Sequence, residues 1–285
     1  SIKNIRREKR LPPDYASGCL FSLPTSVGDK VMSEVRNVDI CVIGAGSGGL
    51  SVAAGAVQMG ASVALFERGK IGGDCLNYGC VPSKALLAAG HAAANYGHTS
   101  QFGIAGGSAD IDFAAVNDHV HGVIDGIAPH DSVERFQDLG VEVYEEGARF
   151  SGPREVVGEN GTKVRARRFV IATGSSPAVP PIPGLADVPF LINETVFNQR
   201  ELPAHLIVVG GGPIGLEMAQ AHRQLGAKVT VLEAMKIMGP DDRELVAVVR
   251  ARLEAEGIVI HEGAKVVSVK SAEGGISVSC EYDGK

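Results

Sequence analysis

The sequence predicts an α/β protein made of two Rossmann-like domains, and a repeated pattern supports this prediction. An apolar run at residues 40–43 leads into a glycine-rich segment that starts at Gly44, and a second run at 206–209 leads into one that starts at Gly210. In both copies a helical stretch and another apolar strand follow the glycines. Strand, glycine turn, helix and strand form the βαβ unit from which nucleotide-binding parallel sheets are built.

The two copies align at an offset of 166 residues (210 − 44). In each copy the first glycine would make a tight turn, the second would admit a pyrophosphate, and the third would let the helix pack closely. The helix N-terminus would stabilise the phosphates. An acidic residue 23 positions after the first glycine (67 − 44 and 233 − 210) is placed to bind ribose hydroxyls. The positions identical in both copies are, in first-copy numbers, Gly44, Gly46, Gly49, Leu50, Ala53, Gln58, Gly60, Ala61, Val63 and Glu67.

The composition argues against a nucleic-acid-binding protein and against a membrane protein. The formal net charge is −6, so no basic surface is expected for nucleic acid or anionic lipid. An uncharged stretch of 27 residues spans 40–66, but its glycines favour a buried strand, a turn and a helix over a membrane span. Residues 1–36 lack a signal-peptide core, and the five cysteines are not spread as a disulfide framework. We therefore expect a cytoplasmic protein with small-molecule partners.

The chain divides into three predicted parts. We expect an N-terminal extension at residues 1–36, a first domain at 37–185 and a second domain at 186–285. A cluster of prolines at 177–183 marks the crossing between the two domains. Between the repeats, the patterns predict helices over 84–98 and 113–137 and short strands over 141–144, 155–157, 163–165 and 169–172, with a hairpin turn at Asn160-Gly161.

Two cysteines, Cys75 and Cys80, follow the first repeat directly. A pair at this spacing is, by itself, more often two buried thiols than a redox centre. Pro82 suits the first turn of a helix, so Cys80 would lie at a helix N-terminus, where the helix dipole favours the thiolate that exchanges disulfides. Lys84 adds positive charge nearby.

The segment Gly-Gly-Asp-Cys-Leu-Asn-Tyr-Gly-Cys-Val-Pro-Ser-Lys at 72–84 resembles the redox-disulfide signature of class I pyridine nucleotide-disulfide oxidoreductases. This family includes lipoamide dehydrogenase, glutathione reductase and mercuric reductase. Asp74 departs from the threonine often found there. Ile-Ala-Thr-Gly at 171–174 resembles the strand end at the flavin site of the family, and the resemblance extends over residues 37–285. It implies two domains of the three-layer ββα type, each with a parallel sheet, helices and a small β-meander.

The resemblance also implies cofactors and site residues. Electrons would pass from NAD(P)H through FAD to a Cys75–Cys80 disulfide, and then to a small-molecule disulfide or dithiol substrate, as in dihydrolipoamide dehydrogenase. Glu233 argues for NADH because its carboxylate would repel a 2′-phosphate, while Lys236 and Arg243 leave NADPH possible. No metal ligands are predicted. The implied FAD residues are Gly44, Gly46, Gly49, Glu67, Lys84, Ala148, Thr173 and Gly174, and the implied NAD(P) residues are Gly210, Gly212, Gly215, Glu217, Glu233 and Val266.

Two alternatives to this activity stay open. Mercuric-reductase-like activity on Hg(II) would use the same cysteine pair. The chain also lacks the segment that supplies the catalytic histidine and the dimer interface in this family, which indicates a C-terminally truncated protein whose full-length form would be a homodimer. A non-catalytic fragment that binds FAD and NAD is therefore the second alternative.

Overall fold

The computed structural model describes residues 35–107 and 109–282. The predicted N-terminal extension at 1–36 lies outside the described residues, apart from its last two positions. The first strand, β1 (Arg36–Ile43), begins at the second of these. No helix within the described ranges is both long enough and apolar enough to cross a membrane.

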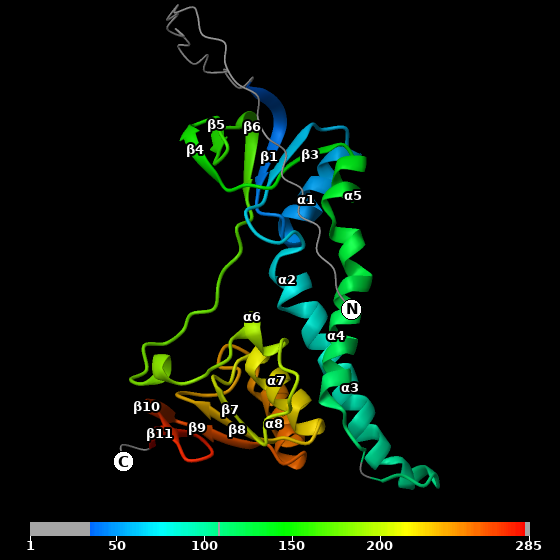
Figure 1. The fold of residues 1–285 in the computed structure, drawn as a ribbon, viewed down its shortest axis with the longest axis vertical. Helices are drawn as coiled ribbons and strands as arrows, with labels where there is room; N and C mark the ends of the chain where they lie inside the picture. The colour runs from blue at the N-terminus through cyan, green and yellow to red at the C-terminus, as the bar shows by residue number, and fades with distance from the viewer. Residues whose placement is uncertain (1–34, 108, 283–285) are drawn as a thin grey trace, which may run out of the picture. The chain divides into compact units, whose positions relative to one another are not determined.

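The first repeat forms a six-stranded sheet with the order β3-β2-β1-β6-β5-β4 (Figure 1). Its parallel strands are β1, β2 (Val63–Phe66), β3 (Val141–Tyr144) and β6 (Lys163–Ile171). Strands β4 (Ala148–Gly152) and β5 (Glu155–Gly158) run antiparallel as a small meander. Helix α1 (Ser47–Gln58) connects β1 to β2, as the βαβ pattern predicts.

Strand β2 is buried on both of its faces. All four of its residues are buried, and they alternate between two apolar clusters. Leu65 packs with Leu50 of α1, whereas Phe66 packs on the other face with Val156 of β5. Strand β2 is therefore covered by helix α1 on one face, and its other face packs against residues of the meander.

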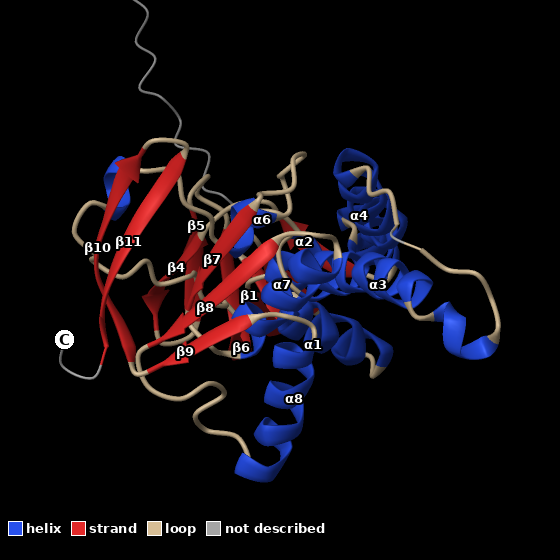
Figure 2. Cartoon of the chain, turned by 90° about the horizontal axis from the view of Figure 1, so that it is seen from below, coloured by secondary structure: helices blue, strands red, loops and turns tan. Residues whose placement is uncertain are grey.

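The second repeat forms a three-stranded parallel sheet with the order β7-β8-β9. The strands are β7 (His205–Val209), β8 (Lys228–Glu233) and β9 (Val259–Glu262), and the helices are α7 (Pro213–Gln224) and α8 (Arg243–Ala255). An antiparallel hairpin of β10 (Ala264–Ala272) and β11 (Gly275–Tyr282) follows (Figure 2). The predicted α/β fold with two Rossmann-like units is confirmed.

The single helix predicted over 113–137 is wrong. The structure has α4 (Phe113–Ile127), a 3-10 turn η2 (Ala128–Asp131) and α5 (Val133–Asp138). Pro129 has no backbone N–H to continue the helical ladder. Ser132 is extended, and its hydroxyl accepts a hydrogen bond from the Arg135 N–H at 3.2 Å, which starts a new helix.

Two predicted strands also differ from the structure. The separate strands expected at 163–165 and 169–172 form one strand, β6. Val164 and Ala166 are buried and alternate with exposed charged residues, so the charges do not interrupt the strand. Strand β4 was not predicted, since its short sequence, Ala-Arg-Phe-Ser-Gly, has little apolar content and ends in glycine. Short elements complete the fold: α2 (Gly73–Asn77), η1 (Thr99–Phe102), η3 (Leu185–Asp187) and α6 (Asn193–Val196).

Helix α3 (Cys80–Gly97) packs directly against α7. Leu86 of α3 and Met218 of α7 share one buried cluster with residues of α4. Gly90 permits this approach, because a Cβ there would lie 3.0 Å from Gln224 Oε1 and 3.3 Å from the Ala221 carbonyl oxygen. The helix that begins at Cys80 and the helix that begins at the second glycine motif are thus packed together.

Candidate functional site

The first glycine motif forms a loop in which two of the glycines have no substitute. Gly44 has a φ of +105°, its N–H donates to the Phe66 carbonyl at 2.8 Å, and a Cβ would lie 2.2 Å from the Ala172 oxygen. A Cβ on Gly49 would lie only 1.8 Å from the Gly44 oxygen. Gly46 differs, because a Cβ there would meet only the Gly73 Cα, at 3.7 Å. The space beside Gly46 is therefore open.

Glu67, at the end of β2, closes this loop. Its carboxylate accepts hydrogen bonds from the Ala45 N–H at 2.6 Å and from the Gly69 N–H at 2.7 Å. Helix α1 begins at Ser47, and its N-cap, Gly46, provides no side-chain cap; its first turn has no acidic residue. An open space at an uncapped helix N-terminus, beside a fixed carboxylate, fits the pyrophosphate and ribose of a dinucleotide.

A cavity of about 530 Å³ lies over this loop. Six of the eight residues implied for FAD line it, namely Gly44, Gly46, Glu67, Ala148, Thr173 and Gly174. Gly49 lies in α1, packed against the loop, and Lys84 lies in a different cavity. Sequence reasoning missed the charged residues of this cavity, which are Arg68, Asp74, Glu146, Arg149 and Glu159. Of these, Arg68 could have been expected, because it directly follows Glu67.

The second glycine motif repeats the geometry of the first. Gly210 has a φ of +112°, and its N–H donates to the Leu232 carbonyl at 2.9 Å. A Cβ on Gly215 would lie 2.3 Å from the Gly210 oxygen. Glu233 accepts hydrogen bonds from the Gly211 N–H at 2.7 Å and from the Met235 N–H at 2.8 Å. Glu67 and Glu233 therefore make equivalent hydrogen bonds to their loops, as expected from their equal distance of 23 residues from the first glycine.

Helix α7 begins at this second loop. Its N-cap is Gly212, which makes no side-chain cap. One of the residues implied for NAD(P), Val266, lies elsewhere, on β10, where its backbone pairs with Cys280 of β11.

Cys75 lies in the short helix α2, and Cys80 is the first residue of α3. Both are free thiols. Partial burial is the largest cause that raises the pKa of Cys75 to about 11, followed by its interaction with the nearby Cys80 thiol. The close turn between them favours Gly79, since a Cβ there would make tight contacts, 3.3 Å from the Cys75 Cα and 3.0 Å from an Asp74 carboxylate oxygen.

A second cavity, of about 420 Å³, joins the cysteine segment to the second glycine motif. Cys80 and Lys84 line it from α3, and Gly215 and Glu217 line it from α7. The ammonium of Lys84 donates to both Glu217 carboxylate oxygens at 2.7 Å. Because both side chains are partly exposed, this ion pair serves more to orient the two groups than to stabilise the fold.

Asn193 of α6 also lines this cavity and was not predicted from the sequence. Its side-chain amide donates to the Asp74 carboxylate at 2.8 Å. The two residues are 119 positions apart, so local spacing gave no signal of the contact. Asp74, the departure from the family signature, therefore lines both cavities.

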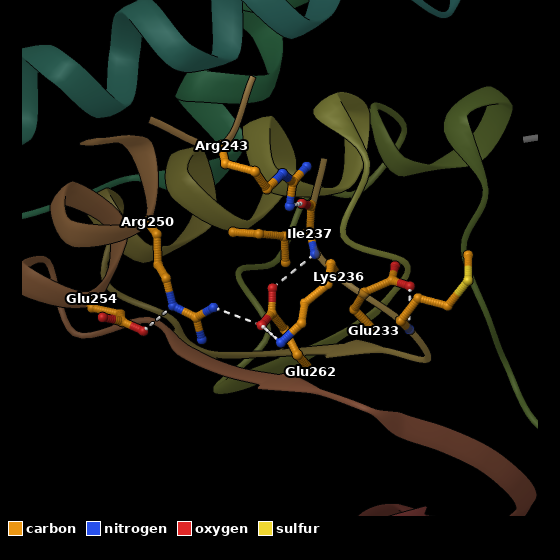
Figure 3. Close-up of polar contacts among 8 residues, drawn as sticks. Glu233, Lys236, Ile237, Arg243, Arg250, Glu254 and Glu262 are labelled. Carbon is orange, nitrogen blue, oxygen red and sulfur yellow. Dashed lines mark hydrogen bonds and ion pairs between the residues drawn. The ribbon is translucent and has the colours of Figure 1, made fainter. Parts of the chain in front are cut away.

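A network of charged side chains stands next to Glu233. Glu262 is its register partner on β9, and Glu262 accepts hydrogen bonds from the Ile237 N–H and the Lys236 ammonium, each at 3.0 Å, and from Arg250 at 2.8 Å (Figure 3). Partial desolvation raises the pKa of Glu262, but these three donors outweigh it and lower the pKa to about 2. The charged carboxylate is thus favoured in the folded chain.

The depressed pKa of Glu262 predicts a loss of stability in acid. The stabilisation is complete above the ordinary pKa of 4.5 and is lost as the pH falls towards about 2. Because the Lys236 partner is exposed to solvent, we expect an effect of only about 1–2 kcal/mol. Urea unfolding of the chain and of Glu262→Gln between pH 5 and pH 2 would measure it. Equal pH slopes for the two proteins would contradict the assignment.

The family model described as "Pyridine nucleotide-disulphide oxidoreductase" matches residues 38–284. A mercuric reductase of Streptomyces lividans is 35% identical over 243 residues, which cover 84% of this chain and 51% of that protein. A dihydrolipoyl dehydrogenase of Geobacillus stearothermophilus is 34% identical over 250 residues, which cover 86% and 52% of the two chains.

Among solved structures, a Cu(II) complex of the HOCl-induced flavoprotein disulfide reductase RclA from Escherichia coli superposes with a TM-score of 0.72 at 27% identity. The match covers 85% of this chain and 53% of that one. The chain thus spans about half the length of the relatives that it matches. The resemblance seen in residues 72–84 is confirmed, and the chain belongs to the pyridine nucleotide-disulfide oxidoreductase family of flavoproteins.

Proposed function

We propose that this chain carries the nucleotide-binding and redox-disulfide parts of an FAD-dependent NAD(P)H:disulfide oxidoreductase. Residues 37–185 would bind FAD, residues 186–285 would bind the nicotinamide nucleotide, and residues 1–36 would be an extension. The observation that carries the proposal is the second cavity, which Cys80 lines together with the start of α7. A thiol of the first unit and the glycine motif of the second unit thus share one space.

Several of the implied residues then have a physical role. The loops at Gly46 and Gly212 leave room for pyrophosphates at two uncapped helix N-termini, while Glu67 and Glu233 would hold the riboses. Bound FAD would supply hydride acceptance from NAD(P)H and two-electron transfer to the disulfide. Lys84, fixed by Glu217, would orient groups within the second cavity.

The cysteine pair would perform the exchange with substrate. Two electrons and two protons convert the Cys75–Cys80 disulfide to two thiols, and the thiol pair then reduces a substrate disulfide to a dithiol as its own disulfide forms again. The two cysteines flank a tight turn at Gly79, which supports a disulfide between them. By resemblance, Cys80 would face the flavin and Cys75 would attack the substrate.

The relatives favour two kinds of redox substrate. Dihydrolipoyl dehydrogenases indicate a small dithiol or disulfide, and mercuric reductases indicate Hg(II) as the alternative. Both would use the same cysteine pair. A chain that binds FAD and NAD without turnover is the third candidate, because this chain spans only half of each relative. A homodimer is proposed for the whole protein.

The visible absorption spectrum of the purified chain, recorded anaerobically with FAD, tests the proposal. Addition of NADH should bleach the flavin band and produce a long-wavelength thiolate–flavin charge-transfer band. Lipoamide should then restore the oxidised spectrum, whereas reoxidation by Hg(II) alone would favour the mercuric-reductase alternative. Binding of FAD without any response to NADH or NADPH would favour the non-catalytic fragment, and a colourless protein would contradict FAD binding.

A further inference from the structure

The segment that follows Glu233 is fastened to the second glycine loop. The Met235 N–H donates to the Glu233 carboxylate at 2.8 Å, and the Met238 N–H donates to the Gly211 carbonyl at 2.8 Å. Ile237 lies directly beneath this loop, since a Cβ on Gly211 would lie 2.6 Å from its Cγ2. Lys236 therefore lies between Met235 and Met238, which are hydrogen-bonded to Glu233 and to Gly211, beside the proposed ribose position.

Despite this position, the Lys236 ammonium is held elsewhere. It pairs with Glu262 at 3.0 Å, and the same carboxylate accepts from the Ile237 N–H (Figure 3). The Glu262 side chain is only 13% exposed, whereas that of Lys236 is 69% exposed. The Glu262 carboxylate is thus largely buried, whereas the Lys236 side chain that pairs with it is exposed to solvent.

The two arginines near this segment are also engaged by the chain itself. The Arg243 guanidinium donates to the carbonyl oxygens of Met238 and Gly239 and to that of Asp241. Arg250 is shared between Glu262 and Glu254, each at 2.8 Å. Each of these cations thus has its acceptor in the described part of the chain.

We propose that Glu262 is a positioning residue that sets the nucleotide preference, by drawing Lys236 away from the ribose 2′ position. This inference rests on the proposed nicotinamide nucleotide site. A 2′-phosphate carries about −1.5 to −2 charges and would meet Glu233, while each nearby cation within the described residues is already paired by the chain itself. A free 2′-hydroxyl can instead donate to the Glu233 carboxylate. Glu262 thereby favours NADH, although the cations that could bind NADPH are present.

Two non-redox probes separate the effect from turnover. The affinities of the FAD-saturated chain for ADP-ribose and for 2′-phospho-ADP-ribose would be measured by titration calorimetry. In Glu262→Gln the amide oxygen can still accept from the Ile237 N–H, but the charge that holds Lys236 is gone. We expect the affinity for the 2′-phosphorylated probe, relative to ADP-ribose, to rise about tenfold, since a charge-assisted hydrogen bond to phosphate becomes available.

Matched variants make this result specific. Glu254→Gln removes a carboxylate from the same network without touching Lys236, so it should leave the ratio unchanged. Addition of Lys236→Met to Glu262→Gln should abolish the gain. Lys236→Met alone should change neither affinity, and this variant serves if Glu262→Gln fails to fold.

The outcomes also distinguish this inference from the proposed function. If ADP-ribose binds and the ratio stays unchanged in a folded Glu262→Gln, the positioning role is overturned while the nucleotide site stands. A large loss of 2′-phospho-ADP-ribose binding in Lys236→Met alone would overturn it as well. If neither probe binds to the unmodified chain, the proposed nucleotide site itself fails, and the inference falls with it.

Discussion

Replacement of either Cys75 or Cys80 by serine is expected to abolish NADH-dependent disulfide reduction. The proposed reaction requires a disulfide between Cys75 and Cys80 to break and form again, and a serine hydroxyl cannot form such a bond. We expect the rate to fall by about three orders of magnitude or more, as when a covalent nucleophile is removed. Flavin binding should persist, because neither cysteine lines the cavity over the first glycine loop. Steady-state rates with NADH and lipoamide, together with flavin absorbance, would measure both quantities.

The other described cysteines provide the controls. Cys280→Ser changes a thiol on β11 and should leave the rate unaffected. Cys41 is fully buried, and burial raises its pKa to about 12, so it should resist alkylation at neutral pH. Intact mass after mild oxidation and alkylation should show one disulfide in the unmodified chain and none between residues 75 and 80 in either variant. A Cys75→Ser protein that keeps its turnover would disprove the proposed reaction.

Gly49→Ala is expected to destabilise the fold, whereas Gly46→Ala is expected to weaken FAD binding. At Gly49 the new Cβ would lie 1.8 Å from a backbone oxygen, so the loop must move, and we expect a loss of about 3 kcal/mol or more in unfolding free energy. At Gly46 the nearest atom is 3.7 Å away, so the fold should keep its stability to within about 1 kcal/mol. The added methyl would instead fill the space where a pyrophosphate would lie, and FAD affinity should fall about 100-fold or more.

Urea unfolding of the chain without cofactor and fluorescence titration with FAD separate the two effects. Gly215→Ala is the matched variant in the second motif, because its Cβ would lie 2.3 Å from the Gly210 oxygen. It should destabilise the fold as Gly49→Ala does. A Gly46→Ala protein that binds FAD normally would show that the cofactor does not use this loop.

The sequence predicts those parts of the fold that depend on local geometry. Gly44 and Gly210 require positive φ, and Pro82 marks the helix that starts at Cys80, so both loops and the cysteine turn could be located from spacing alone. A distant partner gives no such signal. The Lys84–Glu217 pair spans 133 positions, and the Glu262 network depends on which strand lies beside β8. Lys84, Glu217 and Lys236 are each indicated by the sequence, but the ion pairs that join Lys84 to Glu217 and Lys236 to Glu262 are not.

The two glycine loops are held in the same way, each by one carboxylate, Glu67 in the first and Glu233 in the second. Because Glu67 and Glu233 accept hydrogen bonds from the equivalent backbone amides of Ala45 and Gly211, the two loops would offer similar contacts to a bound dinucleotide. Under the proposed function, any preference between dinucleotides would have to come from residues beside each loop. Gly44 faces the backbone of Ala172, whereas a Cβ on Gly210 would have no described atom within 4 Å. The glycine motif would therefore be a dinucleotide-binding loop common to both units, and the choice of cofactor would depend on the residues beside it.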